Sequence, residues 1–163
     1  MDQNSPTGSR WVNVSIYVGV AFFLLALIAS AVIIPQLRLL HFFQALIYLA
    51  VIALTRRNRT SAWGFGVGVI IPALWNALNL FVTHLFQAGA GQLWSLLRSG
   101  RVTRPDTLLV FVGGVAHILL IVACMAGFLQ LRPAKKHWLQ FFGGGLLAFA
   151  YFALIIATVA PRQ

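Results

Sequence analysis

Acidic side chains are almost absent from this sequence of 163 residues, which holds only Asp2 and Asp106 and no glutamate. Paired carboxylates for general acid–base catalysis, dinuclear carboxylate metal sites and a carboxylate relay at mid-membrane are therefore excluded. Cysteine is equally scarce, because Cys124 alone cannot form an internal disulfide. The sequence also lacks His-Glu-x-x-His, Gly-x-Ser-x-Gly and phosphate-loop motifs, so we expect a protein that is not an enzyme.

Charged residues are few and apolar residues are many. Only 9% of the chain is charged and 60% is apolar, whereas a soluble domain carries about 25% charged residues. The apolar residues form long blocks instead of alternating with polar ones, which predicts an all-α integral membrane protein with a single domain over residues 1–163. The formal net charge of +10 comes from basic residues in the breaks between blocks, where contact with anionic lipid headgroups explains them without a nucleic-acid partner.

Five apolar blocks predict a bundle of five transmembrane helices, each close to the ~20 residues that cross a bilayer. The expected spans cover residues 11–34, 37–54, 63–86, 107–131 and 139–160. Helix is expected because an open sheet would leave backbone groups unpaired in lipid. Ala29-Ser30-Ala31 resembles a signal-peptide cleavage site, but the first block is longer than a signal core of about 7–15 residues, so we expect a retained first span.

The connection between the third and fourth blocks differs from the others. Gly89 and Gly91 are expected to end the third span. After them, one face of a short predicted helix carries Leu93, Leu96 and Leu97. The arginines expected to contact anionic lipid headgroups are Arg98, Arg101 and Arg104. The pattern is typical of a helix in the membrane interface, and an ordinary polar loop is the alternative.

The distribution of basic residues favours an N-terminus on the inner side of the membrane. That orientation places seven on the inner side: Arg10, Arg56, Arg57, Arg59, Arg132, Lys135 and Lys136. It places five on the outer side: Arg38, Arg98, Arg101, Arg104 and Arg162. The excess of seven over five is small, but it has the sign that the positive-inside rule requires.

Polar residues within the blocks form stripes, taken at 100° per residue. The stripe of the second block comprises His41, Gln44, Tyr48 and Thr55. That of the third comprises Asn76, Asn79, Thr83 and Gln87, with His84 at its edge. That of the fourth comprises Asp106, Gly113, His117 and Cys124. The first block is apolar on nearly every side, so we expect it to face lipid.

Polar groups are costly in lipid, so stripes on three helices predict a polar cavity near one interface that binds or passes a small solute. Its expected lining is His41, Gln44, Tyr48, Pro72, Asn76, Asn79, Thr83, His84 and His117. Pro72 is included in this lining because it deprives the carbonyl of Gly68 of its helical hydrogen-bond partner and favours a kink. The alternative interpretation is that these groups only form hydrogen bonds between helices.

Two other functions remain open from the sequence. A scaffold or anchor subunit of a larger membrane complex, or a homo-oligomer, would use the small-residue faces at Gly64-x-x-x-Gly68 and Gly143–Gly145. No cofactor is required by any motif, although His41 and His84 lie at a similar expected depth. They would therefore suit a b-type haem, and with His117 they would suit a transition metal.

Overall fold

The computed structural model describes residues 10–57 and 60–158, and these form helices joined by short turns, with no strand among them. The elements in chain order are α1 (Arg10–Ile33), the 3-10 helix η1 (Pro35–Leu37), α2 (Arg38–Arg57), α3 (Trp63–Ala77), the π-helix η2 (Leu78–Val82), α4 (Leu85–Ser99), α5 (Pro105–Gln130) and α6 (Lys135–Thr158).

Five segments are long and apolar enough to cross a membrane. They are α1, η1 with α2, α3 with η2, α5 and α6, and they contain 20 to 26 residues each. At about 1.5 Å per residue the shortest measures about 30 Å, which matches the hydrocarbon core of a bilayer. The described residues thus agree with the all-α, five-span fold expected of a multi-pass membrane protein. Residues 159 and 160 of the last predicted span lie outside the described residues.

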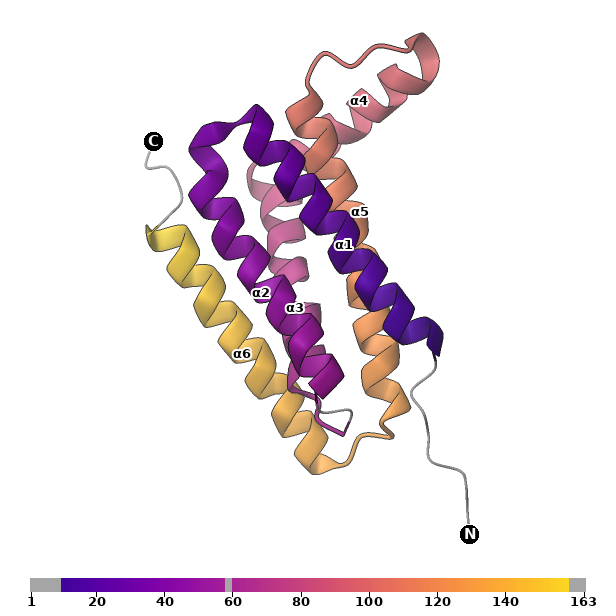
Figure 1. Ribbon diagram of the computed structural model, residues 1–163, viewed down its shortest axis with the longest axis vertical. Helices are drawn as coiled ribbons and strands as arrows, with labels where there is room; N and C mark the ends of the chain where they lie inside the picture. Colours follow the sequence, from indigo (N-terminus) through magenta and orange to yellow (C-terminus); the bar gives the residue numbers. More distant parts are fainter. Residues whose placement is uncertain (1–9, 58–59, 159–163) are drawn as a thin grey trace.

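Helix α1 has a packed face, contrary to the expectation that the first span faces only lipid. It lies along α5 in Figure 1 and buries seven residues: Val12, Ile16, Gly19, Val20, Phe23, Ala26 and Leu27. The opposite face carries exposed apolar residues such as Phe22 and Leu25. Because both faces are apolar, composition did not show which of them packs.

Helix α3 is the centre of the bundle and contacts α2, α5 and α6. Its contact with α6 depends on glycines on both helices. A Cβ atom on Gly66 would collide with the carbonyl oxygen of Phe141, and one on Gly144 would collide with the carbonyl oxygen of Trp63. The predicted small-residue face at Gly143–Gly145 is therefore used here for packing within the chain, whereas Gly64 faces Thr55 of α2 and Gly68 faces Cys124 of α5.

The third span ends earlier than predicted, at Val82 instead of Phe86. The π-helical turn η2 changes the helical period, and His84 then adopts a left-handed conformation (φ 55°) that separates η2 from α4. Gly89 and Gly91 do not end the span but lie inside α4. A helix of 15 residues, α4, therefore connects the third and fourth spans, where the sequence left a short helix or a polar loop open.

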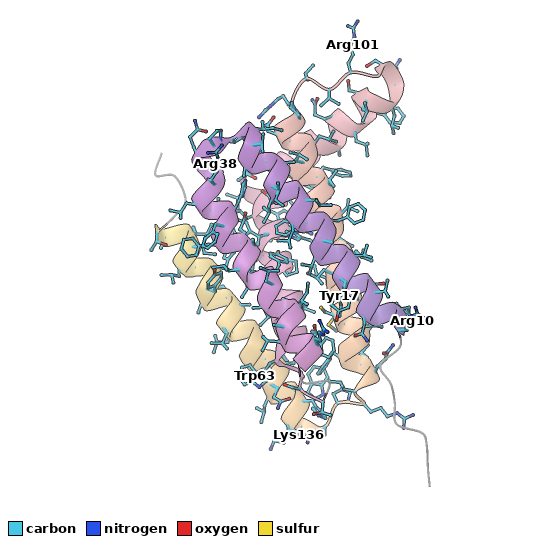
Figure 2. The ribbon with its side chains drawn as sticks, in the orientation of Figure 1. Arg10, Tyr17, Arg38, Trp63, Arg101 and Lys136 are labelled. Carbon is cyan, nitrogen blue, oxygen red and sulfur yellow. The ribbon has the colours of Figure 1, made fainter. Side chains whose placement is uncertain are left out.

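Helix α4 packs against the start of α5 and extends beyond the bundle (Figure 1). Gly89 makes this contact possible, because a Cβ there would meet the carbonyl oxygen of Thr107 and, at 2.6 Å, the Cβ of Phe111. In Figure 2, Arg38 and Arg101 lie toward the end of the molecule that carries α4, whereas Arg10, Trp63 and Lys136 lie toward the other. The basic residues therefore mark two opposite ends, as a serpentine path requires.

Candidate ligand cavity

A cavity of about 230 Å³ lies at the α4 end of the bundle, between α1, α2, α3 with η2, and α5. Most of its wall is apolar, from residues such as Leu27, Leu40, Leu109 and Val110. Its polar lining comprises Ser30, His41, Gln44, Trp75, Asn79, Asp106 and His117. Four of these residues, His41, Gln44, Asn79 and His117, belong to the lining predicted from the sequence, and they come from three different spans.

The upper wall of the cavity holds a chain of two hydrogen bonds. His41 Nδ1 lies 2.8 Å from Oε1 of Gln44, and His41 Nε2 lies 2.9 Å from the hydroxyl of Ser30. Because the amide oxygen can only accept, Nδ1 carries the proton and donates it, which leaves Nε2 to accept from Ser30. This chain ties the end of α1 to the start of α2 and directs the Gln44 side chain.

The floor holds a second chain, which joins α2, α3 and α5. The amide nitrogen of Asn76 donates to the carbonyl oxygen of Gly114 at 3.1 Å, so its Oδ1 faces Nδ1 of His117 at 2.9 Å. Nδ1 is consequently the donor, and Nε2 accepts from the Tyr48 hydroxyl at 2.7 Å. Tyr48 and Asn76 thus do not line the cavity but fix His117, which does.

Aromatic packing closes the cavity beneath His117. The ring of Phe23 lies 4.2 Å from that of His117 and 4.3 Å from that of Tyr48, measured between centroids. Farther along the helices toward the opposite end, the interior is filled by fully buried side chains, among them Val20, Val51, Ile71, Leu120 and Cys124. The cavity therefore occupies one half of the bundle only.

Besides Tyr48 and Asn76, three more of the residues predicted to line the cavity do not do so. Pro72 is buried inside α3, which continues through it to Ala77. Thr83 and His84 are exposed at the junction of η2 and α4, where the chain no longer follows the regular α-helix assumed for the predicted stripe. The wider turn of η2 rotates every later residue, so Asn76, Asn79, Thr83 and Gln87 do not share one face of one helix.

Three polar residues of the lining were not predicted from the sequence. Ser30 is the only polar residue between Val18 and Pro35, and that isolation was a usable signal. Asp106 had been placed on the same face as His117, but not in the site, and its Oδ2 pairs with the guanidinium of Arg104 at 3.1 Å. Trp75 has a buried indole nitrogen without a hydrogen-bond partner among the described residues. Trp75 lies in the middle of the predicted third span, unlike Trp63 and Trp138 at span ends, and that position was a usable signal.

Among the residues that the structure describes, no group of three or more His, Cys, Asp or Glu side chains is placed to hold a metal ion. Both ring nitrogens of His41 are engaged by Gln44 and Ser30, and His84 lies outside the cavity. The haem pair His41 and His84 gains no support from this geometry.

Comparison of the chain with protein families, with curated proteins and with solved structures finds no match.

Proposed function

We propose that the protein binds a small, mostly apolar solute with at least one hydrogen-bonding group in this cavity, near one membrane interface. One observation carries the proposal: polar side chains from the second, third and fourth spans line a single cavity together with Ser30 of the first. A largely apolar wall with a few convergent polar groups is the usual character of a ligand site.

Binding is favoured over passage through the membrane. The floor is closed by His117, Tyr48 and Phe23, and the packed side chains beyond it leave no continuation of the cavity among the described residues. A solute would have to return by the side from which it entered. A receptor, carrier-associated or storage role fits this form better than a channel does.

A cavity-filling variant tests the proposal. Ala26 lines the cavity, and Ala26→Leu places three more carbon atoms in it, whereas Ala21→Leu adds the same atoms on the exposed face of α1. In lipid nanodiscs, a library of small monocyclic compounds screened by ligand-observed NMR is expected to yield binders for the native protein and for Ala21→Leu. Ala26→Leu is expected to lose them.

The same pair of variants also shows whether the cavity is only a packing defect and not a ligand site. If no compound binds the native protein and Ala26→Leu raises its melting temperature, the cavity is a packing defect, because filling such a defect stabilises a protein. The proposal would then be abandoned.

We further propose that α4 lies in the headgroup region of the membrane and contacts anionic lipids. The exposed side of α4 combines Trp94 and Leu97, which are 66% and 72% exposed, with Arg98 near its C-terminus. Tryptophan and basic residues beside apolar ones are typical of interfacial helices. Arg101 follows the helix and is exposed, whereas Arg104 is paired with Asp106 and has less freedom to reach a phosphate.

A further inference from the structure

The polar wall of the cavity offers hydrogen-bond donors that have no partner among the described residues. Gln44 is 6% exposed, and its Oε1 accepts from His41, which leaves its amide N–H groups unused. The Oδ1 of Asn79 faces the Thr83 hydroxyl at 3.4 Å, which likewise leaves its Nδ2 unused. The indole N–H of Trp75 is a third donor without a partner. All three residues line the cavity.

The other buried polar groups are already satisfied by one another. His41 uses both ring nitrogens, one toward Gln44 and one toward Ser30. His117 uses both of its nitrogens, toward Tyr48 and Asn76. Neither imidazole retains a lone pair or an N–H for a ligand. Apart from the hydroxyl oxygen of Ser30 and the second carboxylate oxygen of Asp106, the polar groups left to recognise a ligand are therefore donors.

Charge restricts the ligand further. No lysine or arginine among the described residues lines the cavity, so a carboxylate or phosphate group held there would be desolvated without a cation to compensate it. The one charged lining residue, Asp106, already bonds to Arg104. The amides of Gln44 and Asn79 would also oppose a cationic group with their own N–H dipoles.

We infer that the cavity binds a neutral molecule with a carbonyl-type oxygen on a small apolar body, and that Gln44 and Asn79 donate hydrogen bonds to that oxygen. This inference rests on the proposed function and adds the chemical class of the ligand. The volume of about 230 Å³ suits a substituted monocyclic ring. An apolar cavity of about 150 Å³ in another protein holds benzene.

A pair of isosteric probes separates hydrogen bonding from shape. Acetophenone carries a C=O group where α-methylstyrene carries C=CH2, and the two molecules are otherwise alike. With the full chain in nanodiscs, acetophenone is expected to bind about tenfold more tightly, because its oxygen accepts two hydrogen bonds that the CH2 group of α-methylstyrene cannot accept. The dissociation constants are measured by saturation-transfer NMR against empty nanodiscs.

Substitutions of Gln44 and Asn79 test which side chain donates each hydrogen bond to the ligand. Asn79→Leu and Gln44→Met each replace an amide side chain by an apolar side chain of similar size. Each is expected to weaken acetophenone binding about threefold to tenfold and to leave the affinity for α-methylstyrene unchanged. Gln36→Met is the matched control, because Gln36 is exposed in η1 and does not line the cavity. Infrared spectroscopy of carbonyl-labelled acetophenone needs no variant: donation from the amides is expected to lower its C=O stretching frequency relative to that in lipid alone.

The possible outcomes test the ligand class separately from the proposed function of the cavity. Equal affinity for the two probes, or an unshifted carbonyl band, overturns the donor assignment while the cavity remains a ligand site. Tighter binding of benzyl alcohol than of acetophenone also overturns it, because Gln44 would then present its oxygen to the cavity. If neither probe binds at any accessible concentration, the proposed function fails and the inference fails with it.

Discussion

The Tyr48 hydroxyl donates a 2.7 Å hydrogen bond to Nε2 of His117, and the planes of the two rings lie 4° from parallel. These residues are 69 positions apart in the sequence and come from α2 and α5. Both are buried, with Tyr48 0% and His117 2% exposed. The bond therefore links α2 to α5, two helices that do not pack directly against each other, and it sets the floor of the cavity.

The first prediction concerns this bond. Tyr48→Phe keeps the ring but leaves Nε2 of His117 buried without a donor, so we expect the free energy of unfolding to fall by about 1–2 kcal/mol. Tyr17→Phe is the control, because Tyr17 is 39% exposed on the outer side of α1. Reversible unfolding in mixed detergent micelles, followed by circular dichroism, measures both. Equal effects of the two substitutions would contradict a structural role for the bond.

The second prediction concerns coupling across the floor. Asn76 accepts from His117 and donates to Gly114, so Asn76→Leu frees the imidazole to reorient or to exchange its proton between nitrogens. Tyr48→Phe is then expected to cost about 0.5–1 kcal/mol less in the Asn76→Leu background than in the native chain. A double-mutant cycle of unfolding free energies measures this difference. Strict additivity would show that the two bonds act independently.

The third prediction concerns the contact between α3 and α6. Gly66→Ala would place a methyl group against the backbone of Phe141, which cannot move aside as a side chain can. We expect a loss of about 1–3 kcal/mol in the same unfolding measurement. Gly91→Ala is the matched control, because nothing lies within 4 Å of its added methyl group and alanine favours helix in α4. Destabilisation by Gly91→Ala equal to that by Gly66→Ala would contradict the packing argument.

Much of the fold was predictable because spans are defined by length and hydropathy. Pro35 and Pro133 lie at breaks between helices, and Arg56 lies in the last turn of α2. The packing of α1 could not be predicted, because lipid is as apolar as a leucine side chain and the sequence of an all-apolar helix shows no preferred face. The boundary at Val82 was missed because Leu85 and Phe86 continue the apolar pattern into α4.

About half of the residues predicted for the site line one cavity. The other residues do not line it for a geometrical reason. A stripe drawn at 100° per residue is valid only while the helix remains α-helical, and η2 ends that regularity at Leu78. Asn79 therefore reaches the cavity whereas Thr83 does not. Tyr48 and Asn76 were placed on the correct faces, but whether a polar group lines a cavity or bonds to a neighbour depends on pairings that one stripe does not specify.

The fourth prediction concerns orientation. The N-terminus is expected inside, which places Lys136 on the inner side and Arg101 on the outer side. A membrane-impermeant maleimide added to intact cells is therefore expected to label Arg101→Cys and to leave Lys136→Cys unlabelled until the cells are opened. The native chain is the background control, because Cys124 is fully buried. The reverse pattern would invert the orientation, and labelling of both from one side would contradict the five-span path.

The fifth prediction concerns α4 at the membrane surface. A polarity-sensitive fluorophore on Leu97→Cys is expected to emit at shorter wavelength than one on Ser99→Cys, which lies about 200° around the helix. Both native side chains are exposed, so both sites accept the label. Because Arg98 and Arg101 attract anionic headgroups at about 1 kcal/mol each, the blue shift should be larger in anionic than in neutral nanodiscs and should diminish in Arg98→Gln/Arg101→Gln. It should also diminish at 1 M salt, where charges are screened beyond about 3 Å. Identical, water-like emission from both positions in both lipids would place α4 in solvent and remove the headgroup contact.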